Sequence, residues 1–366
     1  MQKFLVIQTA FIGDVVLATA LIEKLHDYFP DAQIDFLVRK GNEALLTHHP
    51  YLHEVLVWDK KQHKLQNLWR LIRRIRRTKY DKVINVQRFA ATGLLTAFSG
   101  AKETIGFDKN PLSFLFTRKI PHIVSALPHP GATPDPSERP LHEIDRNQRL
   151  IAVFTDDQPA KPRLYPSADD LTKVQPYKDR PYITVSPASV WFTKQYPAEK
   201  WVSFLWLVPS SYTVYLLGAP SDKDLCEYIL YSVEEGPIPD GQSPATTGPN
   251  AVINLSGQLS FLQSAALMKE ASMNYVNDSA PMHFASAVNA PVTAVYCSTI
   301  PAFGFGPLSD VKFIVEIKEP LDCRPCGLHG YRACPRGHFH CAYIIQETQL
   351  LQTLTDGSLS NLPHII

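Results

Sequence analysis

The sequence predicts an α/β protein made of two halves, each built around a parallel β-sheet. Short apolar runs alternate with helical stretches almost from the first residue, at the spacing of right-handed βαβ units. The same alternation resumes after a proline-punctuated stretch near the middle. A length of 366 residues also suits two domains of about 150 residues each better than one core.

In the first half, alternating strands and helices are predicted up to a proline-rich exposed loop at Pro128–Pro140, and a helix follows that loop. The predicted strands are Phe4–Gln8, Ile34–Val38, Glu54–Trp58 and Lys82–Asn85. The predicted helices are Asp14–Phe29, Leu65–Arg77 and His142–Phe154.

A linker is predicted at Pro159–Pro181, and the second half repeats the alternation around a polar surface loop at Glu234–Asn250. Its predicted strands are Tyr182–Ser186, Thr213–Leu217, Asn274–Asn277 and Val292–Cys297, and its predicted helices are Ala198–Val208, Asp222–Tyr231 and His283–Val288. We therefore expect domains at residues 1–165 and 175–345. A tail at 346–366 is expected to pack back on the first domain.

Composition excludes several classes of protein. With 45% hydrophobic and 19% charged residues the chain is globular, and a net charge of +1 gives no reason to expect nucleic acid as a partner. Gln8, Thr9 and Asp14 interrupt the first apolar run too early for a secretory signal, and no apolar run is long enough to span a bilayer. We expect a soluble, cytoplasmic protein.

The first motif, Gln8–Asp14, joins the first strand to the first helix. Gly13 lets the backbone approach a ligand, and Asp14 would stand at the carboxyl end of a parallel strand. The alternative is that Asp14 only caps the helix. The motif is not a dinucleotide fingerprint.

The second half carries three further motifs at strand ends. After its first strand, Ser186 and Ser189 can donate hydrogen bonds to a diphosphate, and Lys194 can supply the positive charge. Lys194 could equally be a solvated loop lysine. The other candidates for nucleotide contacts lie at later strand-to-helix junctions and could also be caps or packed side chains; they are Asp222, Asp278, Ser279, Ala280 and His283.

Together these motifs resemble family-nine glycosyltransferases, the ADP-heptose:lipopolysaccharide heptosyltransferases. The resemblance covers nearly the whole chain, including His142-x-x-Asp145-Arg146 and the cysteine-bearing tail, although many relatives have glycine where this chain has Ala280. It rests mainly on Gly13-Asp14, the Lys194…Pro197…Trp201 block, Gly218-Ala219 and Asp278-Ser279…His283.

This resemblance implies a GT-B fold: two Rossmann-like domains facing across a cleft, with the acceptor mainly on the first and the nucleotide sugar mainly on the second. It implies that Asp14 is the general base of an inverting transfer. Lys194, Ser189 and the helix start at Ser279–Ala280 would stabilise the departing diphosphate without a metal ion. The expected ligands are ADP-heptose and a lipid-linked saccharide acceptor, no cofactor is required, and Asp222, or else Asp224, would contact the ribose.

A basic segment, Arg70–Lys79, carries interleaved apolar residues and predicts an amphipathic helix. Such a helix can bind an anionic membrane surface, which would place the protein on the inner face of the inner membrane. The alternative is a solvated helix face.

Four cysteines crowd near the end of the chain, at Cys323, Cys326, Cys334 and Cys341. Structural zinc is one interpretation, because Cys323 and Cys326 have the spacing of zinc ligands. Cys334 and Cys341 lack the short spacing usual for the second pair of ligands. Reduced thiols and a strained disulfide are therefore together favoured over zinc.

Three alternatives to heptosyl transfer stay open. The protein could be a GT-B transferase for another nucleotide sugar, or a nucleotide-sugar or glycolipid binding protein without catalysis. Retention of Asp14 argues against the binding protein. The third alternative, a Rossmann oxidoreductase, lacks a glycine-rich fingerprint.

Overall fold

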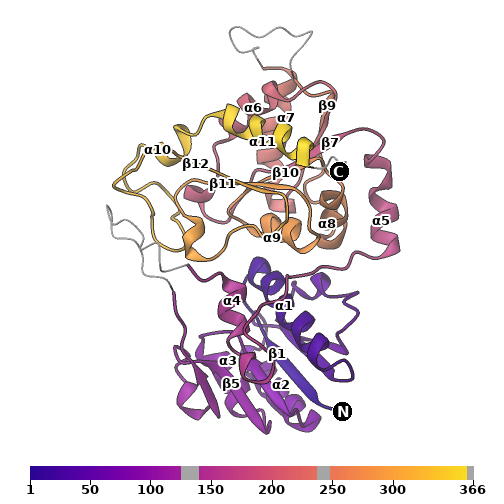
Figure 1. The fold of residues 1–366 in the computed structure, drawn as a ribbon, viewed down its shortest axis with the longest axis vertical. Coiled ribbons are helices and arrows are strands. Elements are labelled where there is room, and N and C mark those ends of the chain that lie inside the picture. Colours follow the sequence, from indigo (N-terminus) through magenta and orange to yellow (C-terminus); the bar gives the residue numbers. More distant parts are fainter. Residues whose placement is uncertain (125–139, 237–247, 361–366) are drawn as a thin grey trace, which may run out of the picture. The chain divides into compact units, whose positions relative to one another are not determined.

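The computed structural model describes residues 1–124, 140–236 and 248–360, with side chains up to residue 355. The chain divides into two compact units, one formed by residues 1–125 and 140–165 and the other by residues 126–139 and 166–366 (Figure 1). Most of the loop expected at Pro128–Pro140 and most of the one expected at Glu234–Asn250 lie outside the described residues.

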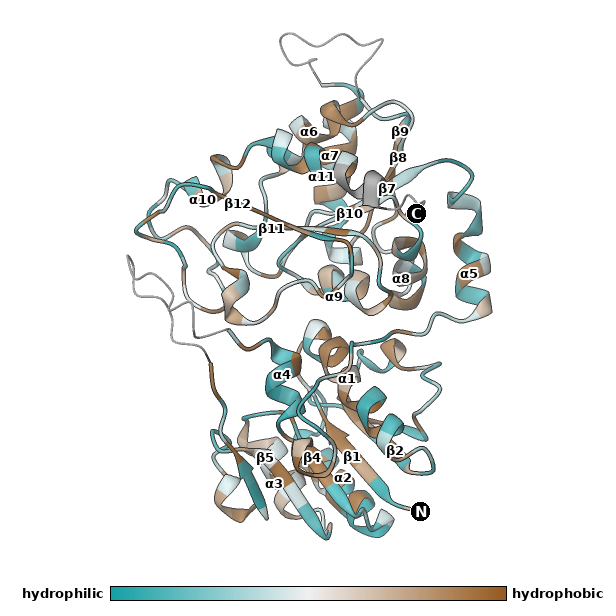
Figure 2. Ribbon diagram, in the orientation of Figure 1, coloured by the Kyte–Doolittle hydropathy of each residue, from teal (hydrophilic) through white to brown (hydrophobic). Residues whose placement is uncertain are grey.

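The first unit is built on a six-stranded, wholly parallel sheet in the order β3-β2-β1-β4-β5-β6. Hydrophobic residues dominate its central strand β1 (Figure 2), where Phe4, Leu5, Val6 and Ile7 are fully buried. The strands are β1 (Lys3–Ile7), β2 (Gln33–Arg39), β3 (Glu54–Trp58), β4 (Lys82–Asn85), β5 (Glu103–Phe107) and β6 (Arg118–Ile120).

The helices of the first unit follow their hydrophobic pattern. The longest, α1 (Ile12–Tyr28), is buried continuously from Val15 to Leu25, whereas α2 (Lys64–Thr78) buries only one stripe of apolar residues. The other helices of this unit are α3 (Ala90–Ala97) and α4 (Glu143–Gln148).

The second unit repeats this design with a parallel sheet in the order β12-β11-β10-β7-β8-β9. Its strands are β7 (Tyr182–Ser186), β8 (Thr213–Leu216), β9 (Ala251–Asn254), β10 (Met273–Asn277), β11 (Val292–Tyr296) and β12 (Lys312–Glu316). Its helices are α5 (Ala168–Val174), α6 (Ala198–Leu207), α7 (Lys223–Glu234), α8 (Phe261–Lys269), α9 (Ala280–Ala287), α10 (His340–Tyr343) and α11 (Glu347–Ser360).

Short 3₁₀ turns connect these elements at Glu43–Leu45, Ser113–Leu115, Ala152–Phe154, Gln175–Tyr177, Phe192–Lys194, Pro220–Asp222 and Pro301–Phe303. Within the described ranges, no helix is both long and apolar enough to cross a membrane.

The predicted α/β class, with two Rossmann-like parallel sheets, is confirmed. One segment differs in detail from the prediction. The segment expected to be a linker contains α5, which begins at a capping box formed by Ser167 and Asp170. The described part of the tail packs within the second unit, where Leu350 and Leu354 of α11 belong to the core around Trp201 of α6.

Candidate active site

Each sheet has one place where the strand order reverses, between β1 and β4 in the first unit and between β7 and β10 in the second. Connections from these neighbouring strands leave in opposite directions, so a crevice opens outside their carboxyl ends, and ligands of open α/β sheets bind there. We call these places the first and the second switch point.

At the first switch point, Asp14 lies in the first turn of α1, directly beyond β1, and is half-buried. Its Oδ2 accepts a hydrogen bond from the Phe11 backbone N–H at 3.2 Å. Asp14 therefore caps α1, as the plainer interpretation of the sequence expected. A carboxylate has about four acceptor positions, so capping orients the group without excluding a second role. Gly13 precedes it and is also half-buried.

Cationic side chains surround the loop that leads into Asp14. Lys60, just after β3, donates from Nζ to the Thr9 carbonyl at 3.0 Å and to Thr9 Oγ1 at 2.8 Å. Burial, with the nearby charges of Arg39 and Lys64, lowers the pKa of Lys60 to about 8. The Arg39 guanidinium also lies 5.4 Å from the centre of the exposed Phe11 ring. This edge of the sheet therefore favours an anionic ligand.

His122, which follows β6, also lies near cationic side chains. Burial, together with the charges of Arg88 and Arg146, lowers its pKa to about 4 against the opposing effect of Asp108. His122 is therefore uncharged at neutral pH, and the cations around it are guanidinium groups.

At the second switch point, Lys194 and Asp278 form an ion pair, with Nζ 2.7 Å from Oδ2. The two side chains are only 15% and 9% exposed, so solvent screens the pair weakly. Lys194 follows β7 and Asp278 follows β10, which are neighbours in the sheet. Thr299 donates from Oγ1 to the same Asp278 oxygen at 2.7 Å and fixes the carboxylate.

The residues after Asp278 form a helix start suited to a phosphate. Ser279 is the N-cap of α9, and the first turn, which includes Ala280, has no acidic side chain. The partial positive charge of the helix start is thus not already balanced by a carboxylate of that turn. His283 lies in the same helix but is buried, with 5% of its surface exposed.

The predicted serines lie on either side of a turn after β7. Ser186 is 2% exposed and its hydroxyl has no hydrogen-bond partner among the described residues, whereas Ser189 is half-buried. Asn277 anchors this turn, because its side chain donates to the Pro187 carbonyl at 2.8 Å and accepts from the Tyr196 N–H at 2.9 Å. The more accessible Ser189 is thus the better placed of the two to meet a ligand.

The turn after β8 holds Asp222, which accepts from the Ala219 N–H at 2.8 Å and from the Ser221 hydroxyl at 3.2 Å. A Cβ at Gly218 would lie 2.9 Å from the Asp222 Cβ, so glycine is what permits this close approach. Asp222 therefore caps this turn and is half-buried, whereas Asp224 is exposed.

Arg324 connects the cysteine-bearing segment to the second switch point. It donates to the carbonyls of Cys297 at 2.7 Å and Thr299 at 2.8 Å, and it pairs with Glu316. These bonds hold the backbone that presents Thr299 to Asp278.

A second connection runs through Thr193, the neighbour of Lys194. Its Oγ1 accepts from the Tyr331 N–H at 2.7 Å and from the Ser298 hydroxyl at 3.0 Å. Gly330 packs against Thr193 and Lys194 with a φ of +75°. A Cβ at this position would lie 2.9 Å from Thr193 Oγ1. The cysteine-bearing segment, which includes Gly330 and Tyr331, thus supports the loop that carries Lys194.

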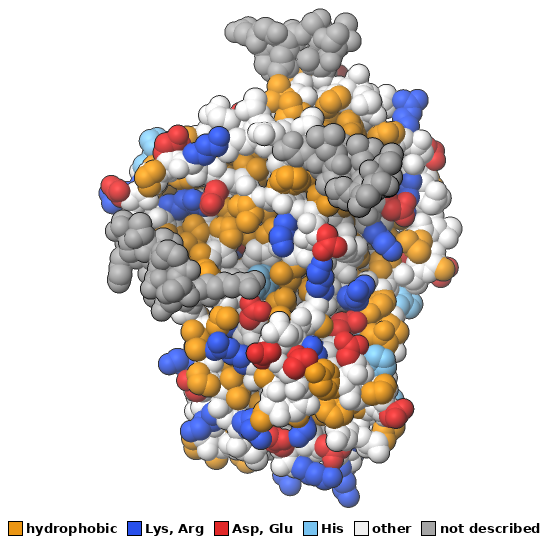
Figure 3. Space-filling view, in the orientation of Figure 1, with side chains coloured by type: hydrophobic (Ala, Val, Ile, Leu, Met, Phe, Trp, Pro, Cys, Tyr) orange, Lys and Arg blue, Asp and Glu red, His pale blue; other side chains and the backbone are white. Residues whose placement is uncertain are grey.

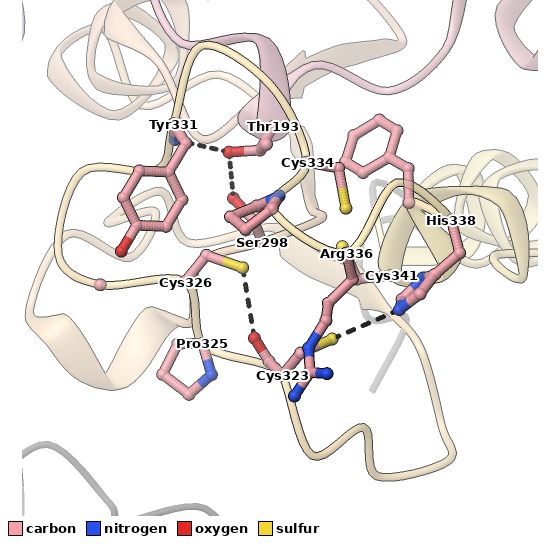
Figure 4. Close-up of a pocket in the computed structure, with 13 residues that line it drawn as sticks. Thr193, Ser298, Cys323, Pro325, Cys326, Tyr331, Cys334, Arg336, His338 and Cys341 are labelled. Atoms are coloured by element: carbon pink, nitrogen blue, oxygen red, sulfur yellow. Dashed lines mark hydrogen bonds between the residues drawn. The ribbon is translucent and has the colours of Figure 1, made fainter.

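The four clustered cysteines are free thiols that line one cavity of about 250 Å³ (Figure 4). His338 Nε2 lies 3.8 Å from Cys323 Sγ. Among the described residues, however, no three His, Cys, Asp or Glu side chains are arranged to hold a metal ion. The thiols as placed do not fit the structural zinc that was one interpretation of their spacing.

Sequence reasoning located the candidates at strand ends but missed the residues that support them: Lys60, Asn277, Thr299 and Arg324. For Lys60 a signal existed, since it follows a predicted strand as Asp14 does. The roles of Asn277, Thr299 and Arg324 depend on which strands are neighbours, which the sequence alone did not supply.

Comparisons of the sequence and of the structure with known proteins point to the same family. Residues 68–327 match the family described as glycosyltransferase family 9 (heptosyltransferase). Lipopolysaccharide heptosyltransferase 3 of Escherichia coli is 25% identical over 302 residues, which cover 79% of this chain and 82% of that protein.

Two solved structures are similar over nearly the whole chain. The glycosyltransferase of family 9 from Veillonella parvula has a TM-score of 0.79 at 19% identity and covers 98% of both chains. ADP-heptose lipopolysaccharide heptosyltransferase II of E. coli has a TM-score of 0.73 at 20% identity, covering 99% of this chain and all of the other.

Proposed function

The chain belongs to glycosyltransferase family 9, and we propose that it is an inverting, metal-independent transferase that moves a heptose from ADP-heptose to a lipopolysaccharide core acceptor. It is a glycosyltransferase, and its two Rossmann-like units have the GT-B fold.

The observation that carries the proposal is the buried pair of Lys194 and Asp278 beside the start of α9. A departing nucleoside diphosphate develops negative charge, which a fixed cation and N–H donors at a helix start stabilise. Lys194 would meet that charge, together with Ser189, Ser279 and Ala280. With a lysine in this position the chemistry has no step that needs a divalent ion.

Asp14 is proposed as the general base. In the transition state the acceptor hydroxyl becomes acidic as its oxygen attacks the anomeric carbon, and a carboxylate within hydrogen-bond reach can take the proton. The bond from the anomeric carbon to the diphosphate oxygen breaks as the new bond forms, so the configuration inverts. The hydrogen bond from Phe11 would hold Asp14 in one orientation for this step.

The acceptor is proposed to be lipid-linked and anionic, on the inner face of the inner membrane. Relatives named as lipopolysaccharide heptosyltransferases support this. So do Lys60 and Arg39, since phosphate groups on a saccharide would find a cationic sheet edge around the loop to Asp14.

The test measures release of nucleoside diphosphate from ADP-heptose in EDTA, with and without core-lipid acceptor. We expect release of nucleoside diphosphate to require the acceptor and to be unchanged by EDTA. A panel of ADP-, UDP- and GDP-sugars run in parallel identifies the donor. Faster turnover of another nucleotide sugar would keep the transferase and replace the donor, and loss of turnover in EDTA would contradict metal independence.

A further inference from the structure

The outward side of α2 carries cationic and apolar side chains that the fold itself does not use. Leu68, Leu71, Ile72 and Ile75 are buried and attach the helix to the first unit. On the other side, Leu65 and Trp69 are 69% and 57% exposed, and the arginines of the helix are exposed as well. We use the term α2 surface for one part of this exposed side; it consists of Leu65, Gln66, Trp69, Arg70, Arg73 and Arg77.

Within one helix, these arginines repel each other. Arg70 and Arg74, like Arg73 and Arg77, are four residues apart, and like charges at that spacing destabilise a helix. No acidic residue occurs between Asp59 and Asp81 to relieve the repulsion. Of the helix's arginines, only Arg74 pairs with an acidic side chain in the described parts of the chain, and that partner is Glu54 of β3. An external anionic partner would compensate the rest.

The apolar members of the α2 surface lie beside the charges. Leu65, Trp69, Arg73 and Arg77 follow at intervals of four residues and therefore form one row along the helix. Trp69, Arg70, Arg73 and Arg77 also line one shallow hollow. Figure 3 shows Lys and Arg side chains gathered at the lower end of the first unit, the end near which Figure 1 labels α2. Adjacent exposed apolar side chains rimmed by charged ones are typical of an interaction surface, whereas single exposed apolar residues are common on any protein.

We propose that the α2 surface docks the protein onto an anionic lipid bilayer, with α2 parallel to the membrane plane. Leu65 and Trp69 would enter the boundary between headgroups and acyl chains, where tryptophan is favoured. Arg70, Arg73 and Arg77 would contact lipid phosphates. The inference rests on the proposed function only in that a lipid-linked acceptor gives the enzyme a reason to work at a membrane.

The form of the surface favours a bilayer over a small phosphate ligand or a nucleic acid. From Arg70 to Arg77 the charges spread over about 10 Å of helix, and do not converge on one point as in a phosphate pocket. The net charge of the whole chain is only +1, so no broad basic field supports nucleic-acid binding. Leu65 adds aliphatic surface that suits lipid and offers a base no stacking partner.

The test is cosedimentation of the full-length protein with phosphatidylglycerol or phosphatidylcholine vesicles, without donor or acceptor. We expect wild type to prefer phosphatidylglycerol vesicles, and Arg70→Ser/Arg73→Ser/Arg77→Ser to bind them about 100-fold more weakly. The matched control, Lys173→Ser/Lys269→Ser/Lys312→Ser, removes the same charge from exposed positions of the second unit and should bind as wild type.

A second variant, Trp69→Ser, tests insertion. Brominated phosphatidylglycerol should quench part of the wild-type tryptophan fluorescence, and that part should be missing in Trp69→Ser. Unchanged vesicle binding by the arginine variant, or an equal loss in the lysine control, would overturn the proposal. Displacement of the protein from vesicles by inorganic phosphate or single-stranded RNA at matched ionic strength would overturn it too, in favour of a ligand of that class.

A failure of the proposed function is distinguishable from a failure of this inference. The arginine variant should transfer at the wild-type rate to a deacylated, water-soluble acceptor and lose rate only with vesicle-embedded acceptor. If the transferase activity itself were wrongly assigned, vesicle binding and its dependence on α2 would be unaffected.

Discussion

At the first switch point, a carboxylate lies in the first turn of a helix and cations surround the loop before it. At the second, with the same strand order, the helix start has no acidic side chain, and a lysine from the neighbouring loop pairs with a buried aspartate. The helix dipole explains why this matters, since Asp14 balances the start of α1 while the start of α9 keeps its attraction for an anion. The fold is therefore repeated, but its two switch points differ in charge, as the proposed roles require: accepting a proton in one unit and stabilising a leaving diphosphate in the other.

The largest effect is expected from Asp14→Asn, which keeps an acceptor for the Phe11 N–H but cannot act as a base. Turnover should fall by about 100- to 10,000-fold, measured as release of nucleoside diphosphate with acceptor present. Asp170→Asn is the matched control, because Asp170 accepts the corresponding N–H in α5, from Ser167 at 2.9 Å. Equal turnover of the two variants would reduce Asp14 to a helix cap.

The next largest effect is expected from Lys194→Ala. Removal of this charge should lower turnover by about 100- to 1,000-fold, as loss of a transition-state donor does in other enzymes. Lys200 provides a close control, since its Nζ also lies 2.7 Å from a carboxylate, that of Glu347, and its side chain is also 15% exposed. Both variants should lose stability, and only Lys194→Ala should lose turnover. A similar loss of turnover in both would show a general structural effect.

The positions of Asp14 and Lys194 could be predicted because each lies in the connection that follows a buried strand, and apolar strands can be recognised in the sequence. The salt bridge between Lys194 and Asp278 could not be predicted, since it depends on β7 lying beside β10 although more than 80 residues separate them. Short strands such as β6 and β12 were missed because they are largely exposed and carry no continuous apolar signal. The helix α5 was missed because the flanking prolines outweighed the capping signal of Ser167.

A smaller effect is expected from Arg324→Ala, which tests whether the cysteine-bearing segment supports the second switch point. Loss of the charged hydrogen bonds to Cys297 and Thr299 should cost about 3 kcal/mol of unfolding free energy, and the donor KM should rise about tenfold as Asp278 and Lys194 lose their fixed geometry. Arg324→Lys should restore only part of the lost unfolding free energy and only part of the donor affinity, because lysine cannot form the paired hydrogen bonds of a guanidinium group.

Arg336→Ala is the control, since Arg336 is an exposed arginine of the same cysteine-bearing segment. A stable Arg324→Ala protein with an unchanged donor KM would disprove the connection through Thr299.

The smallest effect is expected on the pH dependence of the unfolding free energy, through Lys60 at the first switch point. Its native pKa, about 8, lies below the value of about 10.4 in an unfolded chain, so between these pH values the unfolded state binds more protons. The unfolding free energy of wild type should therefore rise relative to Lys60→Gln as pH increases from 7.5 to 10. We expect a change of about 1 kcal/mol, less than the full shift implies because the side chain is partly exposed.

Urea unfolding of both proteins at the two pH values measures this change. A relative loss of wild-type stability over the same interval would mean that Lys60 is paired in the native state so that its pKa lies above that of the unfolded chain.

The most direct test of the division of roles is the stereochemistry of one transfer. NMR of the first product formed from ADP-heptose and acceptor gives the anomeric configuration of the new bond. If Asp14 takes the proton while Lys194 stabilises the leaving group in a single displacement, the configuration will be opposite to that of the donor. Retained configuration would require a different path and would contradict the assignment of the two switch points.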